Sequence, residues 1–306
     1  MDEFVIQTDG LTKRYKNVLA VDDLSMEVRR GHVYGLLGPN GSGKTTTMGL
    51  LLGLLRPTSG TFSLFGSSDG IEESLRRVGA IVESPSFYPY LSGLQNLKYF
   101  QMIFGGGPEE DLESLIDRVG LAGRGDDLFR TYSLGMKQRL GIAYALLGNP
   151  DLVFLDEPTN GLDPKGMIEV RELIRSLGDG NRTVLLSSHL LHEVEQVCDS
   201  VTIISNGRLI AQGEVSQLVA TVGSEQVRTK TTDNSKARQI LSALDWVEDV
   251  APHEGSLLVT APIERSSELA AALAHSEVYV MEMGPVRKSL EEYFFEVTGN
   301  REKISQ

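Results

Sequence analysis

The stretch Gly38-Pro39-Asn40-Gly41-Ser42-Gly43-Lys44-Thr45 decides the fold of this chain, because it matches the pattern G-x-x-x-x-G-K-[ST]. Its glycines let the backbone approach a phosphate chain, and successive amide groups can then surround an anion. An apolar run at residues 33–37 precedes the stretch, and an apolar-rich run at residues 45–55 follows it. Strand, glycine loop and helix therefore follow in the order that a phosphate-binding loop requires, with the positive end of the helix aimed at the phosphates.

A pair of carboxylates follows a second apolar run. Residues 152–155 are all apolar, and Asp156 and Glu157 come directly after them. Ligand sites of open α/β sheets lie at this end of the strands. We therefore expect Lys44 to reach the β- and γ-phosphates, and Thr45 and Asp156 to hold Mg²⁺. Glu157 is placed to act as general base toward the attacking water. An acidic turn after a strand is the alternative for this pair.

Composition narrows the class of protein. The chain has 306 residues, which fits one or two domains. Cys198 is its single cysteine, so it cannot form a disulfide within the chain, and we expect a buried core residue in a reducing compartment. The net charge of −13 and the lack of a dense basic run disfavour nucleic acid as a partner. The most apolar long run, residues 48–55, is shorter than the roughly 20 residues of a membrane helix.

The alternation of predicted strands and helices indicates an α/β fold with a parallel sheet covered on both faces. We expect residues 1–222 to form one domain, with an inserted helical subdomain at about residues 91–148. Residues 223–306 read as a small α+β domain in the order βαββαβ, as in ferredoxin-like units. Strands of the first domain are expected at residues 4–8, 24–28, 33–37, 61–64, 80–82, 152–155, 183–187 and 201–205.

Two further features complete a resemblance. One is the segment Tyr132-Ser133-Leu134-Gly135-Met136-Lys137-Gln138-Arg139, which lies between the phosphate loop and the carboxylate pair. The other is the lone His189, which follows the carboxylate pair in the chain. Over residues 4 to about 220, the chain resembles the ATP-binding subunit of an ABC transporter, a P-loop NTPase. The resemblance implies that ATP and Mg²⁺ are bound, and that ATP hydrolysis is coupled to transport.

The resemblance also implies roles for individual residues. Tyr15 would stack on adenine, although an ordinary core or surface tyrosine is the alternative. Residues 38–45 would hold the phosphates, with Thr46 behind them. His189 would contact the γ-phosphate, and its alternative is a structural histidine. Gly161-Leu162-Asp163 resembles the loop that crosses to a partner subunit.

The segment around Ser133 implies a dimer. In the family, this helix start binds the γ-phosphate of ATP held by the opposite subunit, so two copies in head-to-tail arrangement would enclose two ATP molecules. Ser133 and Gly135 agree with the family signature Leu-Ser-Gly-Gly-Gln, whereas Leu134 and Met136 depart from it. Glu83 stands where most members have a glutamine that reaches Mg²⁺, and a carboxylate can also coordinate this ion.

A narrower resemblance concerns one branch of the family. Residues 83–92 and 289–299 are similar to the bacitracin and lantibiotic exporters. The implied function is to power a separate integral membrane permease from the cytoplasmic side of the membrane, for export of an antibiotic, peptide or lipid-like compound. Phe87, Tyr88 and Tyr90 would then dock the permease, with loop packing as the alternative. A soluble regulatory ATPase without a membrane partner is the competing function, and an ATP-sensing module is a third.

Overall fold

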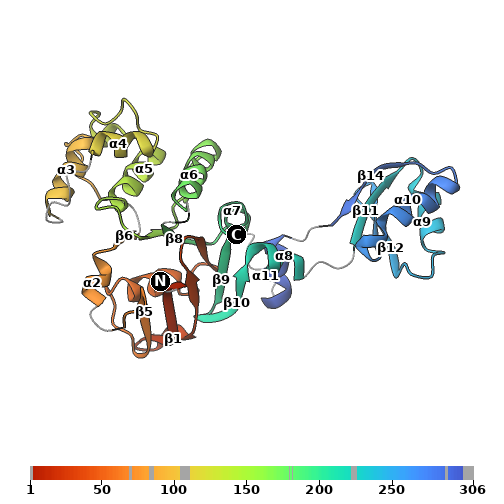
Figure 1. Cartoon of the computed structure of the whole chain (residues 1–306), viewed down its shortest axis with the longest axis horizontal. Helices are drawn as coiled ribbons and strands as arrows, with labels where there is room; N and C mark the ends of the chain where they lie inside the picture. Colours follow the sequence, from red (N-terminus) through yellow and green to blue (C-terminus); the bar gives the residue numbers. More distant parts are fainter. Residues whose placement is uncertain are drawn as a thin grey trace. The chain divides into compact units, whose positions relative to one another are not determined.

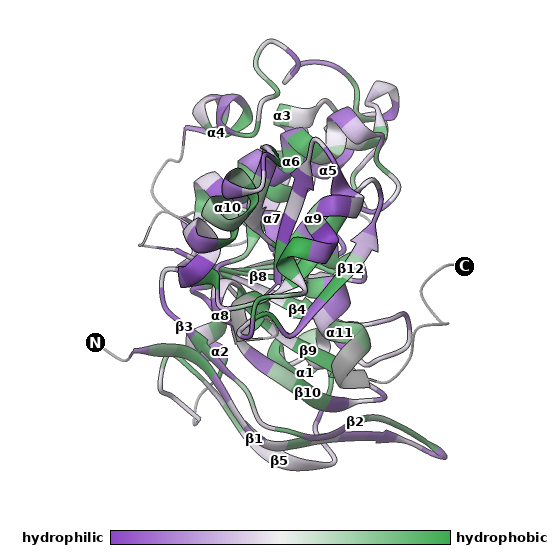
Figure 2. Ribbon diagram, turned by 90° about the vertical axis from the view of Figure 1, so that its right-hand side faces the viewer, coloured by the Kyte–Doolittle hydropathy of each residue, from purple (hydrophilic) through white to green (hydrophobic). Residues whose placement is uncertain are grey.

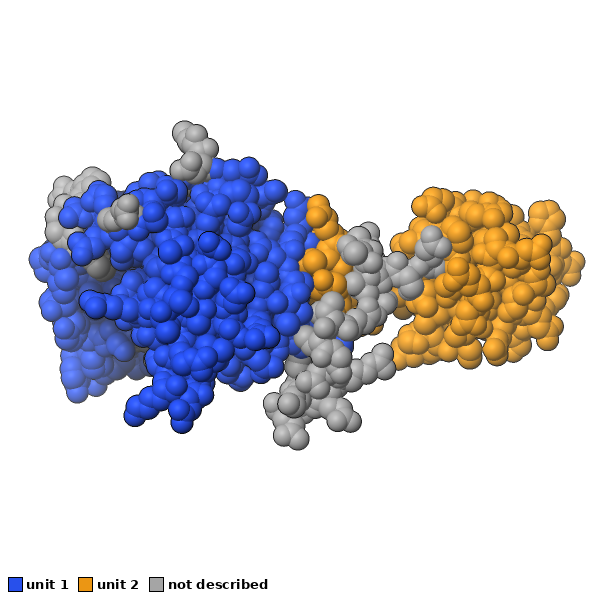
Figure 3. All heavy atoms as spheres, turned by 90° about the horizontal axis from the view of Figure 1, so that it is seen from below, with its two compact units in different colours: residues 1–215, 294–306 blue, residues 216–293 orange. Residues whose placement is uncertain are grey.

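The computed structural model describes residues 3–68, 71–82, 86–103, 111–178, 180, 182–221, 226–286 and 289–298. It divides into two compact units, residues 1–215 with 294–306 and residues 216–293 (Figure 3). The first stretch of the first unit ends at Val215, directly after strand β10 (Arg208–Glu214). The domain boundary expected after residue 222 follows the next helix, α8 (Val215–Thr221), and it stays a prediction.

A six-stranded sheet forms the centre of the first unit, in the order β10-β9-β4-β8-β7-β6. All neighbouring strands pair in parallel except β10, which pairs antiparallel with β9. Strands β4, β7 and β8 are buried along their whole length, and green, the colour of hydrophobic residues, is present near the labels β4 and β8 in Figure 2. The parallel sheet predicted from the sequence is therefore confirmed. Its remaining strands are β4 (Val33–Leu37), β6 (Val78–Ile81), β7 (Leu152–Asp156), β8 (Thr183–Ser188) and β9 (Ser200–Ser205).

A second, antiparallel sheet takes up the early strands. Strand β1 (Phe4–Tyr15) pairs with β2 (Val18–Leu24), β3 (Glu27–Arg29) and β5 (Ser59–Leu64). The single strand expected at residues 24–28 is wrong, because β2 ends at Leu24 and β3 begins at Glu27, each pairing with a different part of β1. Side chains of this sheet pack with α1 (Lys44–Leu51) and the parallel sheet in one core, which includes Ile6, Met48 and Phe154.

Helix α1 ends earlier than expected. The apolar run extends to Leu55, but the helix stops at Leu51, and Gly53 follows in the left-handed region with φ of 69°. Glycine adopts this conformation without the penalty of a side chain and commonly closes helices. The remaining helices of the first unit are α2 (Ile71–Leu75), α3 (Gly93–Ile103), α4 (Leu112–Arg118), α5 (Leu134–Ala145), α6 (Pro164–Leu177) and α7 (Leu191–Val197).

Helices α3, α4 and α5 contact one another and form the predicted helical subdomain (Figure 1). The ring of Phe87 packs edge-on against the rings of Phe100, Phe129 and Tyr144 beneath them. None of the helices in the described ranges combines the length and the apolar content of a membrane-spanning segment. Cys198, directly after α7, is buried, and burial raises the pKa of its thiol well above the ordinary value, as befits a core residue.

The second unit contains a four-stranded antiparallel sheet in the order β12-β13-β11-β14. Helices α9 (Asn234–Leu241) and α10 (Ser266–His275) supply Ala237, Leu241, Leu269 and Leu273 to its core. The element order is the expected βαββαβ, and the ferredoxin-like assignment of this unit stays a prediction. The strands are β11 (Gln226–Thr231), β12 (Asp249–His253), β13 (Ser256–Thr260) and β14 (Val280–Pro285), and helix α11 (Leu290–Thr298) follows.

Asn96 provides a test of the helical subdomain. Its buried amide accepts a hydrogen bond from the Tyr88 amide (2.8 Å) and donates to the carbonyls of Tyr88 and Ser92. Asn96→Ala would leave the Tyr88 amide without this acceptor, whereas the two carbonyls keep the Leu91 and Asn96 amides as donors, so we expect a loss of about 1–3 kcal/mol in the free energy of unfolding. Urea denaturation measures it, with the exposed Lys98→Ala on the same helix as control. Equal midpoints for the two variants would contradict this role.

Candidate functional site

The phosphate loop connects β4 to α1 and requires glycine at specific positions. Gly43 lies in the left-handed region with φ of 106°, and a Cβ there would be 2.3 Å from the carbonyl oxygen of Ala20. A Cβ at Gly38 would be 2.2 Å from the carbonyl oxygen of Ile204. The loop is closed by the Ser42 amide, which donates to the Pro39 carbonyl at 3.1 Å. Side chains are thus excluded where the backbone must approach a ligand.

Donors inside this loop fit a polyphosphate. The Lys44 ammonium is buried and donates to the Gly38 carbonyl at 2.8 Å. The Ser42 hydroxyl is also buried, and it has no hydrogen-bond partner among the described residues. A buried hydroxyl without a partner costs free energy unless a ligand satisfies it. Together with the first amides of α1, these groups form a cationic, donor-rich cradle.

Thr45 and Asp156 meet at the carboxyl end of β7. The Thr45 hydroxyl donates to Oδ2 of Asp156 at 2.9 Å. A hydroxyl and a carboxylate are hard oxygen ligands, and Mg²⁺ typically uses one or two such groups together with phosphate oxygens and water. The residues therefore fit Mg²⁺. The third expected metal ligand, Glu83, lies outside the described residues.

Glu157 joins two other predicted residues. Its Oε1 lies 3.3 Å from the Lys44 ammonium, and its Oε2 lies 2.8 Å from Nδ1 of His189. The backbone of Glu157 is left-handed, with φ of 48°, which is unusual for a residue other than glycine. Such strain persists where the surroundings hold it and often marks a functional site. An acidic turn without a function would not require the contacts of Glu157 with Lys44 and His189, so these contacts favour the functional interpretation of the pair.

The segment around Ser133 lies against another predicted loop. Ser133 begins α5, and its hydroxyl accepts a hydrogen bond from the Met136 amide at 3.2 Å. Asp163 likewise begins α6 and accepts from the Gly166 amide at 3.0 Å. The two helix starts adjoin, because a Cβ at Gly161 would lie 3.2 Å from a methyl carbon of Leu134. Gly135 has a similar neighbour in Leu162, at 3.9 Å from its Cβ position.

These two helix starts are separate from the phosphate loop. In the described ranges, no hydrogen bond or ion pair connects Ser133, Gly135 or Asp163 to residues 38–46. Ser133 and Asp163 are exposed. The structure thus brings together the phosphate loop, the carboxylate pair and His189, and it places Ser133, Gly135 and Asp163 at two adjoining helix starts.

Tyr15 ends strand β1 with 42 % of its surface exposed, and the Lys13 ammonium lies 5.1 Å from the centre of its ring. A core position is therefore excluded, and the ring is available for stacking. Thr46 is half-buried in the first turn of α1, Pro39 is half-buried and Asn40 is exposed.

Ser187 is a residue of the site that was not predicted from the sequence. It stands directly opposite Asp156 in the pairing of β8 with β7, and its hydroxyl bonds the Asp156 carboxylate and the Glu157 backbone amide. A serine at the end of the apolar run 183–187, next to a strand that ends in carboxylates, was the available signal.

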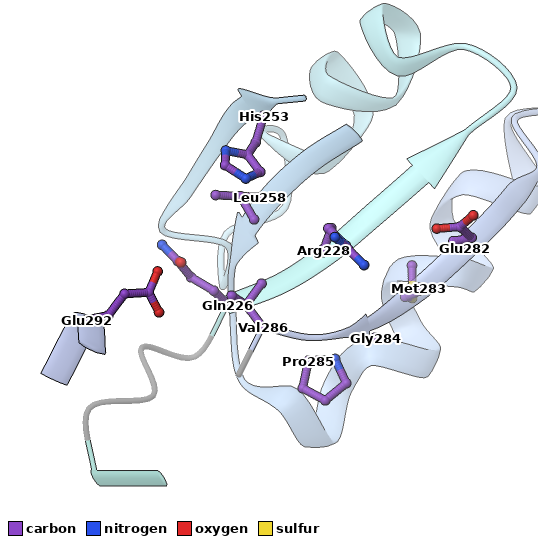
Figure 4. Close-up of a pocket in the computed structure, with 10 residues that line it drawn as sticks. All are labelled: Gln226, Arg228, His253, Leu258, Glu282, Met283, Gly284, Pro285, Val286 and Glu292. Atoms are coloured by element: carbon purple, nitrogen blue, oxygen red, sulfur yellow. The ribbon is translucent and has the colours of Figure 1, made fainter. Parts of the chain in front are cut away.

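A hollow of about 430 Å³ lies in the second unit and is lined by Arg228, Leu258 and Glu282 among others (Figure 4). Its lining mixes acidic, basic and apolar side chains from residues 226–292. The chemistry predicted from the sequence lies entirely within residues 15–189, so this hollow is distinct from the phosphate site.

Gly43 provides a direct test of the loop. Gly43→Ala would force a Cβ against the Ala20 carbonyl, so we expect the loop to distort and affinity for nucleotide to fall at least tenfold. Equilibrium binding of a fluorescent ATP analogue measures the effect. Gly255→Ala is the control, because Gly255 also has a positive φ of 77° but nothing within 4 Å of its Cβ position. Equal affinities would refute the close approach.

Comparisons with known proteins agree with the geometry. Residues 21–160 match the protein family described as "ABC transporter". The uncharacterized ABC transporter ATP-binding protein YdbJ of Bacillus subtilis (strain 168) is 40 % identical over 305 residues, which cover 97 % of this chain and 96 % of YdbJ. The bacitracin transport ATP-binding protein BcrA of Bacillus licheniformis is 39 % identical over 299 residues, which cover 96 % and 97 % of the two chains.

A solved structure described as the ATP binding subunit of an ABC transporter is also similar. It is 32 % identical, with a TM-score of 0.63, and the match covers 71 % of this chain and 92 % of that one. These alignments extend over nearly the whole chain, and the phosphate loop and the carboxylate pair lie in the expected places. A chance match of one short motif is therefore excluded. The chain therefore belongs to the family of ABC transporter ATP-binding proteins.

Proposed function

We propose that this chain hydrolyses ATP to power a separate membrane permease that exports an antibiotic, peptide or lipid-like compound. The observation that carries the proposal is the contact of Glu157 with both Lys44 and His189, beside the Thr45–Asp156 pair. The relative BcrA is named for bacitracin transport, and it matches this chain over nearly its full length. This similarity favours export over a soluble regulatory ATPase.

ATP would be held mainly by charge and by backbone donors. The amides of residues 38–45, the Ser42 hydroxyl and the Lys44 ammonium would bind its phosphates. Thr45 and Asp156 would hold Mg²⁺, which neutralises charge on the phosphates. The exposed ring of Tyr15 would stack on the adenine, a contact that depends little on which base is present. Since the Lys44 ammonium lies between the loop carbonyls and Glu157, binding of phosphate would exchange these partners.

Glu157 would act as the general base in hydrolysis. Its carboxylate would accept a proton from the water that attacks the γ-phosphorus, while the bond to the bridging oxygen breaks and yields ADP and phosphate. His189 holds Oε2 of Glu157 through Nδ1, so its other ring nitrogen is free to face the γ-phosphate. The strained backbone of Glu157 serves this arrangement, because it turns the side chain toward Lys44 and His189.

A second copy of the chain would complete the site. Ser133 and Gly135 lie at the start of a 12-residue helix, whose amide groups favour an anion. They lie apart from the phosphate loop of their own chain, and Ser133 is exposed. In a head-to-tail dimer, this helix start would face the γ-phosphate held by the opposite copy, with Asp163 close to the boundary between them.

Glu157→Gln tests the catalytic role. Removal of the base should lower the rate of ATP hydrolysis by a factor on the order of 10²–10⁴, while ATP still binds and the dimer accumulates. Phosphate release and gel filtration with ATP measure the two effects. Glu172→Gln, an exposed carboxylate on α6, is the control. Unchanged hydrolysis in Glu157→Gln would exclude Glu157 as the base.

An aromatic surface of the helical subdomain is the proposed permease contact. We give this name to the exposed aromatic and aliphatic side chains of Tyr88, Tyr90, Met102 and Ile103, of which Tyr90 is 77 % exposed and Met102 65 %. A hollow of about 290 Å³ nearby is lined by Ile81, Phe87, Phe100 and Tyr144 among others. Phe87 itself is packed between rings, which agrees with the loop-packing alternative for that residue. Exposed apolar surface of this kind typically marks a protein contact.

Tyr90→Ser tests this contact. We expect the variant to hydrolyse ATP at the wild-type rate in isolation, but to associate less with membranes when the permease is present. Fractionation of cells that express both proteins measures the association. Leu54→Ser is the control, because Leu54 is 68 % exposed in the same unit but lies outside the aromatic surface. If wild-type protein also stays out of the membrane fraction and no membrane protein co-purifies, the soluble alternative is favoured.

A further inference from the structure

The side chain of Ser187 occupies a central position between the two carboxylate residues. It is fully buried at the carboxyl end of β8, next to the end of β7. Its hydroxyl accepts a hydrogen bond from the Glu157 amide at 2.9 Å. The same hydroxyl lies in hydrogen-bond contact with Oδ1 of Asp156. One oxygen atom is therefore shared between the residue expected to hold the metal and the residue expected to act as base.

The direction of each hydrogen bond follows from the chemistry of the groups. A backbone amide can only donate, so the Ser187 oxygen accepts from Glu157. The serine proton is then available for Asp156, whose ionised carboxylate can only accept. A serine hydroxyl can make both bonds at once, whereas alanine can make neither. An apolar residue here would leave a buried amide and a buried carboxylate oxygen without this partner.

These bonds determine which way both carboxylates face. With Oδ1 of Asp156 held by Ser187, Oδ2 is the oxygen that faces Thr45 and the phosphate loop. The bond to the Glu157 amide supports a left-handed backbone that is otherwise unfavourable, and the Glu157 carbonyl is held in turn by the Asn160 amide at 3.1 Å. This backbone aims the Glu157 side chain at Lys44 and His189.

We propose that Ser187 is a positioning residue that orients Asp156 for metal binding and Glu157 for proton transfer at the same time. The inference rests on the proposed function of this site. Ser187 would act by orienting Asp156 and Glu157, and it would not contact ATP itself. Residues that orient metal ligands and catalytic groups in this way typically change metal affinity or activity by about 10- to 100-fold when they are replaced.

The test compares full-length Ser187→Ala and Ser187→Cys with the wild-type chain. Ser187→Ala should lower kcat by about 10- to 100-fold and leave KM for ATP nearly unchanged. The Mg²⁺ concentration that gives half-maximal binding of a fluorescent ATP analogue should rise roughly tenfold. Ser187→Cys keeps a weak donor of similar size, so its kcat should lie between those of wild type and Ser187→Ala, and it serves as the test if the alanine variant does not fold.

Two controls separate positioning from general loss of structure. Thr202→Val removes a buried hydroxyl from strand β9 of the same sheet, where it bonds the Tyr34 hydroxyl at 2.9 Å, and it should leave kcat and the Mg²⁺ dependence unchanged. At saturating Mg²⁺, where a weaker metal site no longer limits the rate, Ser187→Ala in the Glu157→Gln background should lower kcat by less than about threefold, because residues that act together are not additive.

The inference is overturned if Ser187→Ala or Ser187→Cys folds and retains the wild-type kcat and Mg²⁺ dependence. It is also overturned if Thr202→Val lowers kcat as strongly, or if the effects of Glu157→Gln and Ser187→Ala multiply in full. The proposed function fails differently, through wild-type hydrolysis in Glu157→Gln. A loss of activity in Glu157→Gln together with normal activity in Ser187→Ala removes only the role of Ser187.

Discussion

The parallel pairing of β4, β8 and β7 is the constraint on which the site depends. The register places Leu37 opposite Ser188, and Asp156 opposite Ser187. Each strand is buried and held on both sides by ladder hydrogen bonds, so the loops that leave their carboxyl ends have little freedom relative to one another. The phosphate loop, the carboxylate pair and His189 are therefore brought together by strands that come from residues 33–37, 152–156 and 183–188.

The buried ammonium of Lys44 explains the polar chemistry around it. Burial of a charge is costly unless partners compensate, and here the Gly38 and Pro39 carbonyls and the Glu157 carboxylate provide them. Phosphate offers stronger negative charge to the same ammonium. The core beneath the site is hydrophobic by contrast. Burial raises the pKa of Tyr34 on β4 to about 12, although its hydroxyl is hydrogen-bonded to Thr202.

The separation of the two predicted phosphate-binding regions has a functional meaning. Ser133 and Asp163 begin adjacent helices of the same chain, and both use their side chains to cap those helices. Arg139 further ties α5 to α6 through Glu169 at 3.1 Å. The second region thus consists of two capped helix starts that are joined by an ion pair. Exposed helix starts of this kind are suited to a site that a second copy completes, as proposed above.

The sequence by itself determined the phosphate loop, the carboxylate pair and the βαβ character of the first unit. These features are local, since a pattern of eight neighbouring residues or a strand followed by two acids can be read without knowing the fold. The order of elements in the second unit was also readable, because turn residues separate its short strands and helices.

Tertiary structure alone decided which distant residues meet. Ser187 and Asp156 are 31 residues apart, and only the register of β8 against β7 lets one hydroxyl bond both the Asp156 carboxylate and the Glu157 backbone amide. The antiparallel pairing of β1 with three other strands likewise depends on long-range contacts, which is why residues 24–28 appeared to be one strand. Backbone conformations such as the left-handed Glu157 follow from those contacts, because the surrounding hydrogen bonds hold a geometry that glutamate by itself disfavours.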